Sequence, residues 1–179
     1  MESMTRAAEL YLEDYYILSE ARSELDRYLD RMLEEVYDAL SSETERLNDE
    51  ESEWRIWRNK SSSGIIQLEL FIKTPQFEFL RHKKSDIYVQ YKDIRQTTRI
   101  TTPKSVEIST FCTRLDKRLK QELNQRSNEL FGLDLIGFRY PAIDTENMDQ
   151  TVEEVVRVMV ESCQRINEII NGFRVNTSG

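Results

Sequence analysis

The hydrophobic pattern of this chain changes its period twice, and this change constrains the fold more than any motif does. In the first part, apolar residues recur every three or four positions, which is typical of an amphipathic helix. Between about residues 53 and 109 they alternate, which favours β-strands, and helical spacing then returns. This succession predicts an α+β domain.

The first segment predicts one long helix that ends near Leu47. No Gly or Pro interrupts residues 1–63, and the periodicity is lost where 48–51 favours a turn. The apolar stripe of this helix consists of Leu18, Ala21, Leu25, Leu29, Met32, Val36 and Leu40. We therefore expect the helix to pack on another element along its length.

Alternation and turn residues predict an antiparallel sheet after this helix. Residues 53–58 and 65–73 predict a hairpin, and 86–92 alternates again. A fourth strand over 98–109 is broken by Pro103, which cannot donate a ladder hydrogen bond, so we expect it at an edge.

The last third of the chain predicts a helix, a short strand and a long helix. A capping pattern begins at Thr113, residues 133–140 are an apolar run, and Asn147 with Gln150 caps the final helix. The predicted order is α-β-β-β-(β)-α-β-α. The fold class is an antiparallel sheet of three to five strands flanked by long N- and C-terminal helices, in a single domain over residues 1–179.

Apolar residues of the last helix follow a heptad spacing. Such a spacing suits a seam between two copies of the chain, and a buried helix in one copy shows it equally well. The predicted homodimer seam consists of Val152, Val156, Met159, Ile166 and Ile170.

Scarce residue types exclude several kinds of site. The 5 Gly form no phosphate-binding cluster, and 2 Cys with 1 His fall short of a structural zinc site. We expect no resident metal or cofactor. We expect both cysteines to be reduced thiols, because two cysteines far apart in the sequence do not form a disulfide framework. The sequence shows no leader peptide and no apolar run of 18 residues, so we expect a cytoplasmic protein without a membrane segment.

Charge is separated along the chain. Residues 1–53 carry a net charge of −12, residues 54–126 carry +9 and residues 127–179 carry −5, which together give −8. The basic middle either binds an anionic partner or balances the acidic helices that pack on it. Both interpretations stay open on the sequence.

Single reactive side chains offer weak signals for catalysis. His82 lies in a basic turn without an acidic partner nearby, so a solvated loop histidine is the better interpretation. Cys112 stands at the expected start of a helix, where the helix dipole lowers a thiol pKa, but a buried structural cysteine is the commoner case.

Aromatic and basic residues interleave in the predicted sheet, which is how sheets stack bases and neutralise phosphates. The competing interpretation places the aromatic rings in the core with the cations around them. The predicted binding residues are Trp57, Arg55, Arg58, Tyr91, Arg95 and Arg99.

Glu69 on the second predicted strand and Gln90-Tyr91-Lys92 on the third form a second candidate site. With the order of helix, three-stranded meander, helix and strand over about residues 25–140, this resembles the core of the PD-(D/E)XK nucleases. The resemblance implies divalent-metal catalysis, with Gln90 in the place of the acid in an acid-x-Lys pair and Glu34 or Glu35 as a further acid. Glu69, Gln90 and Lys92 would be the catalytic residues, with Mg²⁺ as cofactor.

The family's Pro-Asp dipeptide does not precede this triplet, and Asp86 lies about 13 Å from Gln90 along an extended strand. We therefore expect a non-catalytic binding or adaptor protein, a homodimer whose basic sheet region engages an acidic protein partner or nucleic acid. A metal-dependent nuclease is the alternative.

Overall fold

A computed structural model of the chain describes residues 5–50, 52–60, 66–73, 86–95, 104–113, 121, 123, 125 and 140–177. The chain divides into two compact units, residues 1–35 and residues 36–179. Compactness does not report independent folding, so one domain over residues 1–179 stays a prediction.

The first unit is helical. Helix α1 spans Arg6–Glu13, begins where the Thr5 hydroxyl accepts a hydrogen bond from the Ala8 amide, and buries no residue. Helix α2 spans Tyr15–Leu47, so it begins in the first unit and ends in the second. The prediction of one uninterrupted helix was wrong at Asp14, whose backbone leaves the helical conformation. The predicted end at Leu47 is confirmed.

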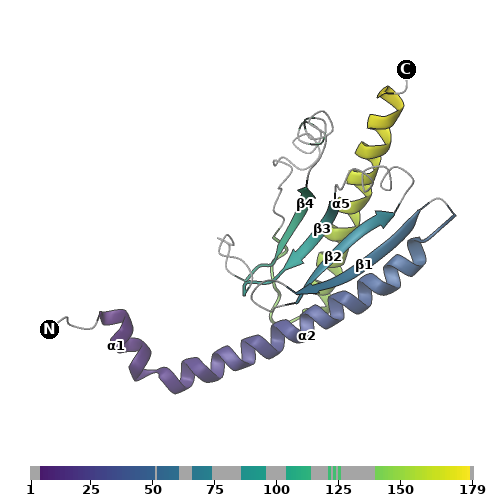
Figure 1. Ribbon diagram of the computed structural model, residues 1–179. Helices are drawn as coiled ribbons and strands as arrows, with labels where there is room; N and C mark the ends of the chain where they lie inside the picture. The colour runs from purple at the N-terminus through teal and green to yellow at the C-terminus, as the bar shows by residue number, and fades with distance from the viewer. Residues whose placement is uncertain are drawn as a thin grey trace. The chain divides into compact units, whose positions relative to one another are not determined.

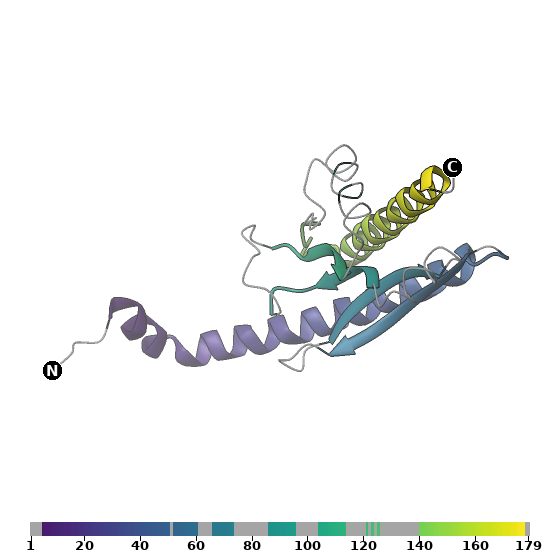
Figure 2. The ribbon, with the colours of Figure 1, turned by 45° about the horizontal axis from the view of Figure 1, so that its top comes forward.

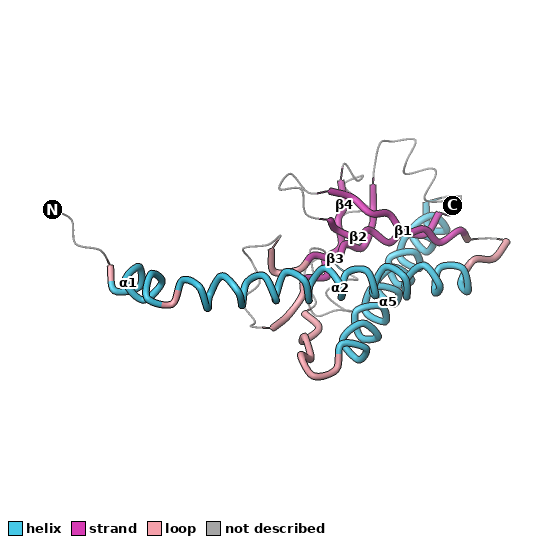
Figure 3. The backbone as a smooth tube through the Cα atoms, turned by 90° about the horizontal axis from the view of Figure 1, so that it is seen from below, coloured by secondary structure: helices cyan, strands magenta, loops and turns pink. Residues whose placement is uncertain are grey.

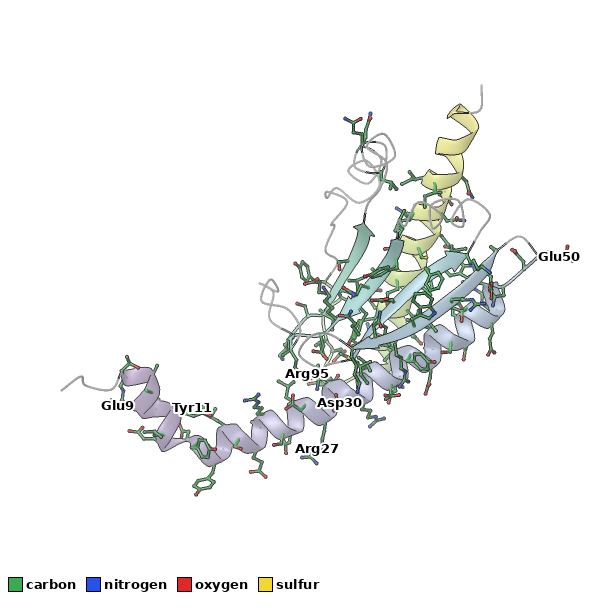
Figure 4. All side chains as sticks on the ribbon, in the orientation of Figure 1. Glu9, Tyr11, Arg27, Asp30, Glu50 and Arg95 are labelled. Carbon is green, nitrogen blue, oxygen red and sulfur yellow. The ribbon has the colours of Figure 1, made fainter. Side chains whose placement is uncertain are left out.

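The second unit contains a four-stranded antiparallel sheet, and the predicted fold class is confirmed. The strands are β1 (Glu53–Lys60), β2 (Ile66–Lys73), β3 (Asp86–Lys92) and β4 (Glu107–Thr113). They lie side by side in sequence order, so that β1 and β4 are the edges of the described sheet (Figure 1). Glu50 marks the turn that joins α2 to β1 (Figure 4).

Helix α5, Met148–Thr177, lies against one face of this sheet and contacts β2, β3 and β4 (Figure 2). Its N-terminus is capped as expected, because the Asn147 side chain accepts a hydrogen bond from the Gln150 amide at 3.2 Å. The view from below also shows α5 running beside the strands (Figure 3). We call the side that α5 covers the apolar face.

The apolar face is the core of the second unit. Every second residue of the central strands points to this face, as period-two alternation requires. Its buried strand residues are Trp54, Leu68, Leu70, Ile72, Ile87, Val89, Tyr91 and Ile108. From α5, Val155, Met159, Ile169 and Cys163 are buried, and the Cys163 thiol donates to the Leu70 carbonyl at 3.8 Å.

Residues of the predicted dimer seam are part of this buried set. Val152, Met159, Ile166 and Ile170 are buried within a single chain, and Val156 is half-buried. Burial inside one copy explains their heptad spacing without a second copy. The homodimer stays a prediction, and its contact surface has to lie largely elsewhere.

The fourth strand begins and ends later than expected. β4 covers Glu107–Thr113, so Cys112 lies on a strand and not at the start of a helix. The argument that a helix dipole activates this thiol therefore fails. The predicted strand over 133–140, apart from its last residue, and the turn with His82 lie outside the described residues.

Candidate functional site

The side of the sheet opposite the apolar face carries polar side chains, and we call it the polar face. Its described members are Glu53, Arg55, Trp57, Asn59, Gln67, Glu69, Phe71, Lys73, Tyr88, Gln90, Lys92, Glu107 and Ser109, most of them polar. The strand register sets Trp57 opposite Glu69, Glu69 opposite Gln90, and Gln90 opposite Ser109. Directly opposite residues share a face of the sheet, so these four form one row across all four strands.

Glu69 lies at the centre of the row and is 3% exposed. Its Oε2 accepts a hydrogen bond from Asn59 Nδ2 at 2.8 Å, and its Oε1 accepts from Gln90 Nε2 at 3.3 Å and from Gln67 Nε2 at 3.4 Å. A carboxylate offers about four lone-pair positions, so three are engaged and one remains. Three amide donors compensate part of the cost of burying this charge.

A second polar pair lies beside this network. Lys92 Nζ is 3.7 Å from Glu107 Oε1, and the two residues are opposite each other in the register of β3 and β4. The Glu107 side chain is 3% exposed and that of Lys92 is 26% exposed. Ser109 is also buried. Buried acids, amides and a hydroxyl in one place are unusual for a structural face, and such clusters concentrate at functional sites.

Trp57 is the large aromatic residue of the polar face that stays exposed, at 44% of its surface. Its ring packs edge-to-face on Phe71, with the ring centroids 4.5 Å apart and the planes at 66°. Phe71 itself is buried. Trp57 therefore has one side held by the protein and another side open.

The predicted binding cations are largely engaged within the chain. Arg55 forms an ion pair with Glu53, and Arg95, just beyond β3, binds buried Asp93 with Nη2 2.6 Å from Oδ2 (Figure 4). The Arg58 guanidinium lies 3.6 Å from the centre of the Tyr37 ring. These contacts favour local charge balance over an open field of cations.

Tyr91 and Arg99 are the remaining predicted binding residues, and neither lies on a surface that the structure describes. Tyr91 is fully buried on the apolar face, so its ring offers no area to a partner in this conformation. Arg99 lies outside the described residues.

Glu69, Gln90 and Lys92, the candidate catalytic residues, share the polar face, and Glu69 and Gln90 are in hydrogen-bond contact. The described topology departs from the nuclease resemblance, which places a helix after the third strand. Among the residues described between β3 and β4 there is no helix, and the two strands pair antiparallel. Glu34 and Glu35 belong to the first compact unit, and their role as a further acid stays a prediction. Within the described ranges, no group of three His, Cys, Asp or Glu side chains is arranged to hold a metal ion.

Sequence reasoning missed several partners in this site. Asn59, Glu107 and Ser109 become neighbours of Glu69, Gln90 and Lys92 only through the strand register, and Asp93 only through its contact with Arg95. For Glu107 and Ser109, alternation with Val106 and Ile108 was the available signal.

The buried thiol is not a nucleophile in this fold. Burial raises the pKa of Cys163 well above its ordinary value, because a thiolate loses its hydration among apolar side chains. The side chain of Cys112 is outside the described set.

Of the helices that the structure describes, none combines the length and the apolar character needed to cross a membrane. Comparisons of the chain with protein-family models, with curated proteins and with solved structures found no match.

Proposed function

We propose that this protein binds nucleic acid through the polar face of its sheet, and that binding rather than catalysis is its function. The observation that carries the proposal is exposed Trp57, held by Phe71 beside an ordered network of hydrogen-bonding side chains. Aromatic rings stack on bases, and the exposed Asn59 amide beside the ring can bind a base edge, whereas buried Glu69 and Gln90 hold that amide in place. On the same face, Arg55 and Lys73 lie beside Glu53, so cations outnumber acids there, which suits a phosphate backbone.

The internal ion pairs predict how such binding depends on salt. Arg55, Lys92 and Arg95 each lie beside an acid, so few phosphates can be neutralised without breaking an existing pair. Each neutralised phosphate of a single strand adds about 0.7 to the slope of log affinity against log salt. We expect a slope of about −1 to −2, which is shallow, because stacking supplies most of the affinity.

Fluorescence anisotropy with the full chain and a labelled 20-nucleotide probe, between about 50 and 200 mM salt, tests this proposal. Arg55→Glu should weaken binding several-fold, because Arg55 is the cation of β1 that lies on the polar face with Trp57. Arg157→Glu is the matched control, because it makes the same charge change on α5, away from the polar face. Absence of binding at about 50 mM salt would contradict the proposal, and so would an equal loss in both variants.

Catalysis at the same face is a second candidate, favoured by the contact between Glu69 and Gln90 with Lys92 two residues further on. The donors suit a hard divalent ion, because Mg²⁺ prefers oxygen ligands and often uses only one or two carboxylates with substrate phosphates. Glu69 retains one lone-pair position, and Gln90 has an amide oxygen. A bound ion would stabilise charge that develops on a phosphodiester, and Lys92 would steady the same charge.

Cleavage assays with Mg²⁺ and Mn²⁺ on DNA and RNA separate the two candidates. If the site is catalytic, Glu69→Gln and Lys92→Ala abolish cleavage and leave binding largely intact, whereas Glu153→Gln on the exposed side of α5 changes neither. We expect no cleavage, because the amide donors already satisfy most of Glu69. Metal-dependent cleavage that Glu69→Gln removes would overturn the non-catalytic proposal.

A homodimer in the cytoplasm completes the proposal. A buried, protonated thiol at Cys163 is compatible with a reducing compartment. Val156 is half-buried, whereas the other residues of the predicted dimer seam are buried within one chain. The proposed contact between copies therefore uses other surfaces as well. Sedimentation at micromolar concentrations measures the state directly.

A further inference from the structure

We propose that Trp57 is a stacking platform for an unpaired nucleobase, so that the preferred ligand is single-stranded nucleic acid. This inference rests on the proposed binding function and specifies its ligand and its main contact. Four features of the described residues support it: the exposure of the indole, its rigid support, the polar and charged side chains beside it on the same face, and the place of its strand at a sheet edge.

The indole combines exposure with support. Trp57 leaves 44% of its surface to solvent, whereas Phe71, against which it packs, is 5% exposed. A ring fixed on one side loses little conformational entropy when a ligand covers its other side. Trp54, the other of the 2 tryptophans, is 6% exposed and points to the apolar face, so it cannot play this role.

Polar groups surround the indole on β1. Asn59 lies two residues along the same face and is held by Glu69, and Arg55 lies two residues in the other direction. Glu53 lies between two cations, Arg55 and Lys73, with Lys73 Nζ 3.4 Å from its carboxylate. The ring is therefore flanked by cations at one end and by an oriented amide at the other. This combination of aromatic surface and positive charge matches a base and its phosphate.

The position of β1 selects for a single strand. β1 is an edge of the described sheet, and residues 57–60 are all exposed, so a strand can approach without entering a closed cavity. In a duplex, neighbouring bases cover both faces of each base, and stacking on a protein ring costs the unstacking energy. An unpaired base has a free face and forms the same stack at no such cost.

Tryptophan fluorescence in a Trp54→Phe background, excited where tyrosine does not absorb, tests the inference, because Trp57 is then the only tryptophan. The titrants are oligo(dT) and oligo(U) of about 15 nucleotides and a DNA hairpin of similar length, in EDTA so that no metal chemistry intervenes. We expect saturable quenching of Trp57 by both single strands and at least tenfold weaker binding of the hairpin. A difference between oligo(dT) and oligo(U) identifies the sugar that the site prefers.

Affinity measurements by anisotropy give an independent readout on the full chain. Trp57→Ala should weaken single-strand binding by about 5- to 150-fold, the range expected for one base–aromatic stack. Trp57→Phe should keep most of the affinity, and Trp54→Phe should keep all of it. Circular dichroism establishes that each variant is folded, and the quenching experiment needs no variant of Trp57.

The outcomes separate this inference from the proposed function. Binding without quenching of Trp57, equal binding of strand and hairpin, or unchanged affinity of Trp57→Ala overturns the inference and leaves nucleic-acid binding intact. Absence of binding to every probe overturns the proposed function itself.

Discussion

Truncation of Met159 tests whether the heptad stripe of α5, the residues of the predicted dimer seam, is the core of one chain or a contact between two chains. The side chain is 0% exposed within a single chain, so Met159→Ala leaves a cavity wherever its neighbours fail to close in. Met→Ala substitutions at such sites cost about 2–5 kcal/mol in free energy of unfolding. For a protein of 179 residues this corresponds to a fall in Tm of roughly 4–20 °C.

Val156→Ala is the matched control for this measurement. Val156 belongs to the same heptad spacing and the same helix but is half-buried, so its truncation should lower the free energy of unfolding by no more than about 1 kcal/mol. Urea unfolding followed by far-ultraviolet circular dichroism measures both variants against the wild type. Sedimentation of the folded proteins reports their oligomeric state in parallel.

Two results would refute the reasoning. The first is a Met159→Ala variant whose urea midpoint equals that of the wild type, because a fully buried side chain cannot be removed without cost. The second is a variant that stays folded and changes from dimer to monomer, which would place the stripe between copies. A loss of stability that is independent of protein concentration supports the core assignment.

Three smaller tests address ion pairs and the buried thiol. Arg95→Ala leaves buried Asp93 without this cation and should cost about 3–5 kcal/mol in urea unfolding. Arg157→Ala removes two exposed ion pairs and should cost less than about 1 kcal/mol, a loss that salt reduces further; an equal cost for both variants would contradict the burial argument. Because burial raises the pKa of Cys163, an unfolded thiol ionises above about pH 8.5 while the folded one stays protonated, so the free energy of unfolding should fall as the pH rises beyond that point. In a Cys112→Ser background, thiol reagents should modify Cys163 slowly in the native protein and rapidly in urea, and rapid native modification would refute its burial.

The fold class and most element boundaries of the described chain could be predicted from local sequence patterns. The change in hydrophobic period located α2, the first three strands and α5, because burying one face of a helix or strand imposes that period locally. The cap at Asn147 and the end of α2 near Leu47 were also predictable, since capping and turn preferences act over a few residues. The break at Asp14 was missed, because no Gly or turn dipeptide marks it. The late start of β4 was missed although Pro103 precedes it, because a Pro can also lie within an edge strand.

Which residues of the sheet lie together depends on the pairing of the strands and could not be predicted from local patterns. Glu69 and Gln90 are 21 positions apart in sequence, and strand register alone sets them opposite each other with Asn59 within reach of the same carboxylate. The same register turned Tyr91 into the core and left Trp57 exposed, although both are aromatic residues beside cations in the sequence. Register depends on the pairing of distant segments, and a shift of one residue exchanges the two faces, which is why local pattern could predict the strands and not the site.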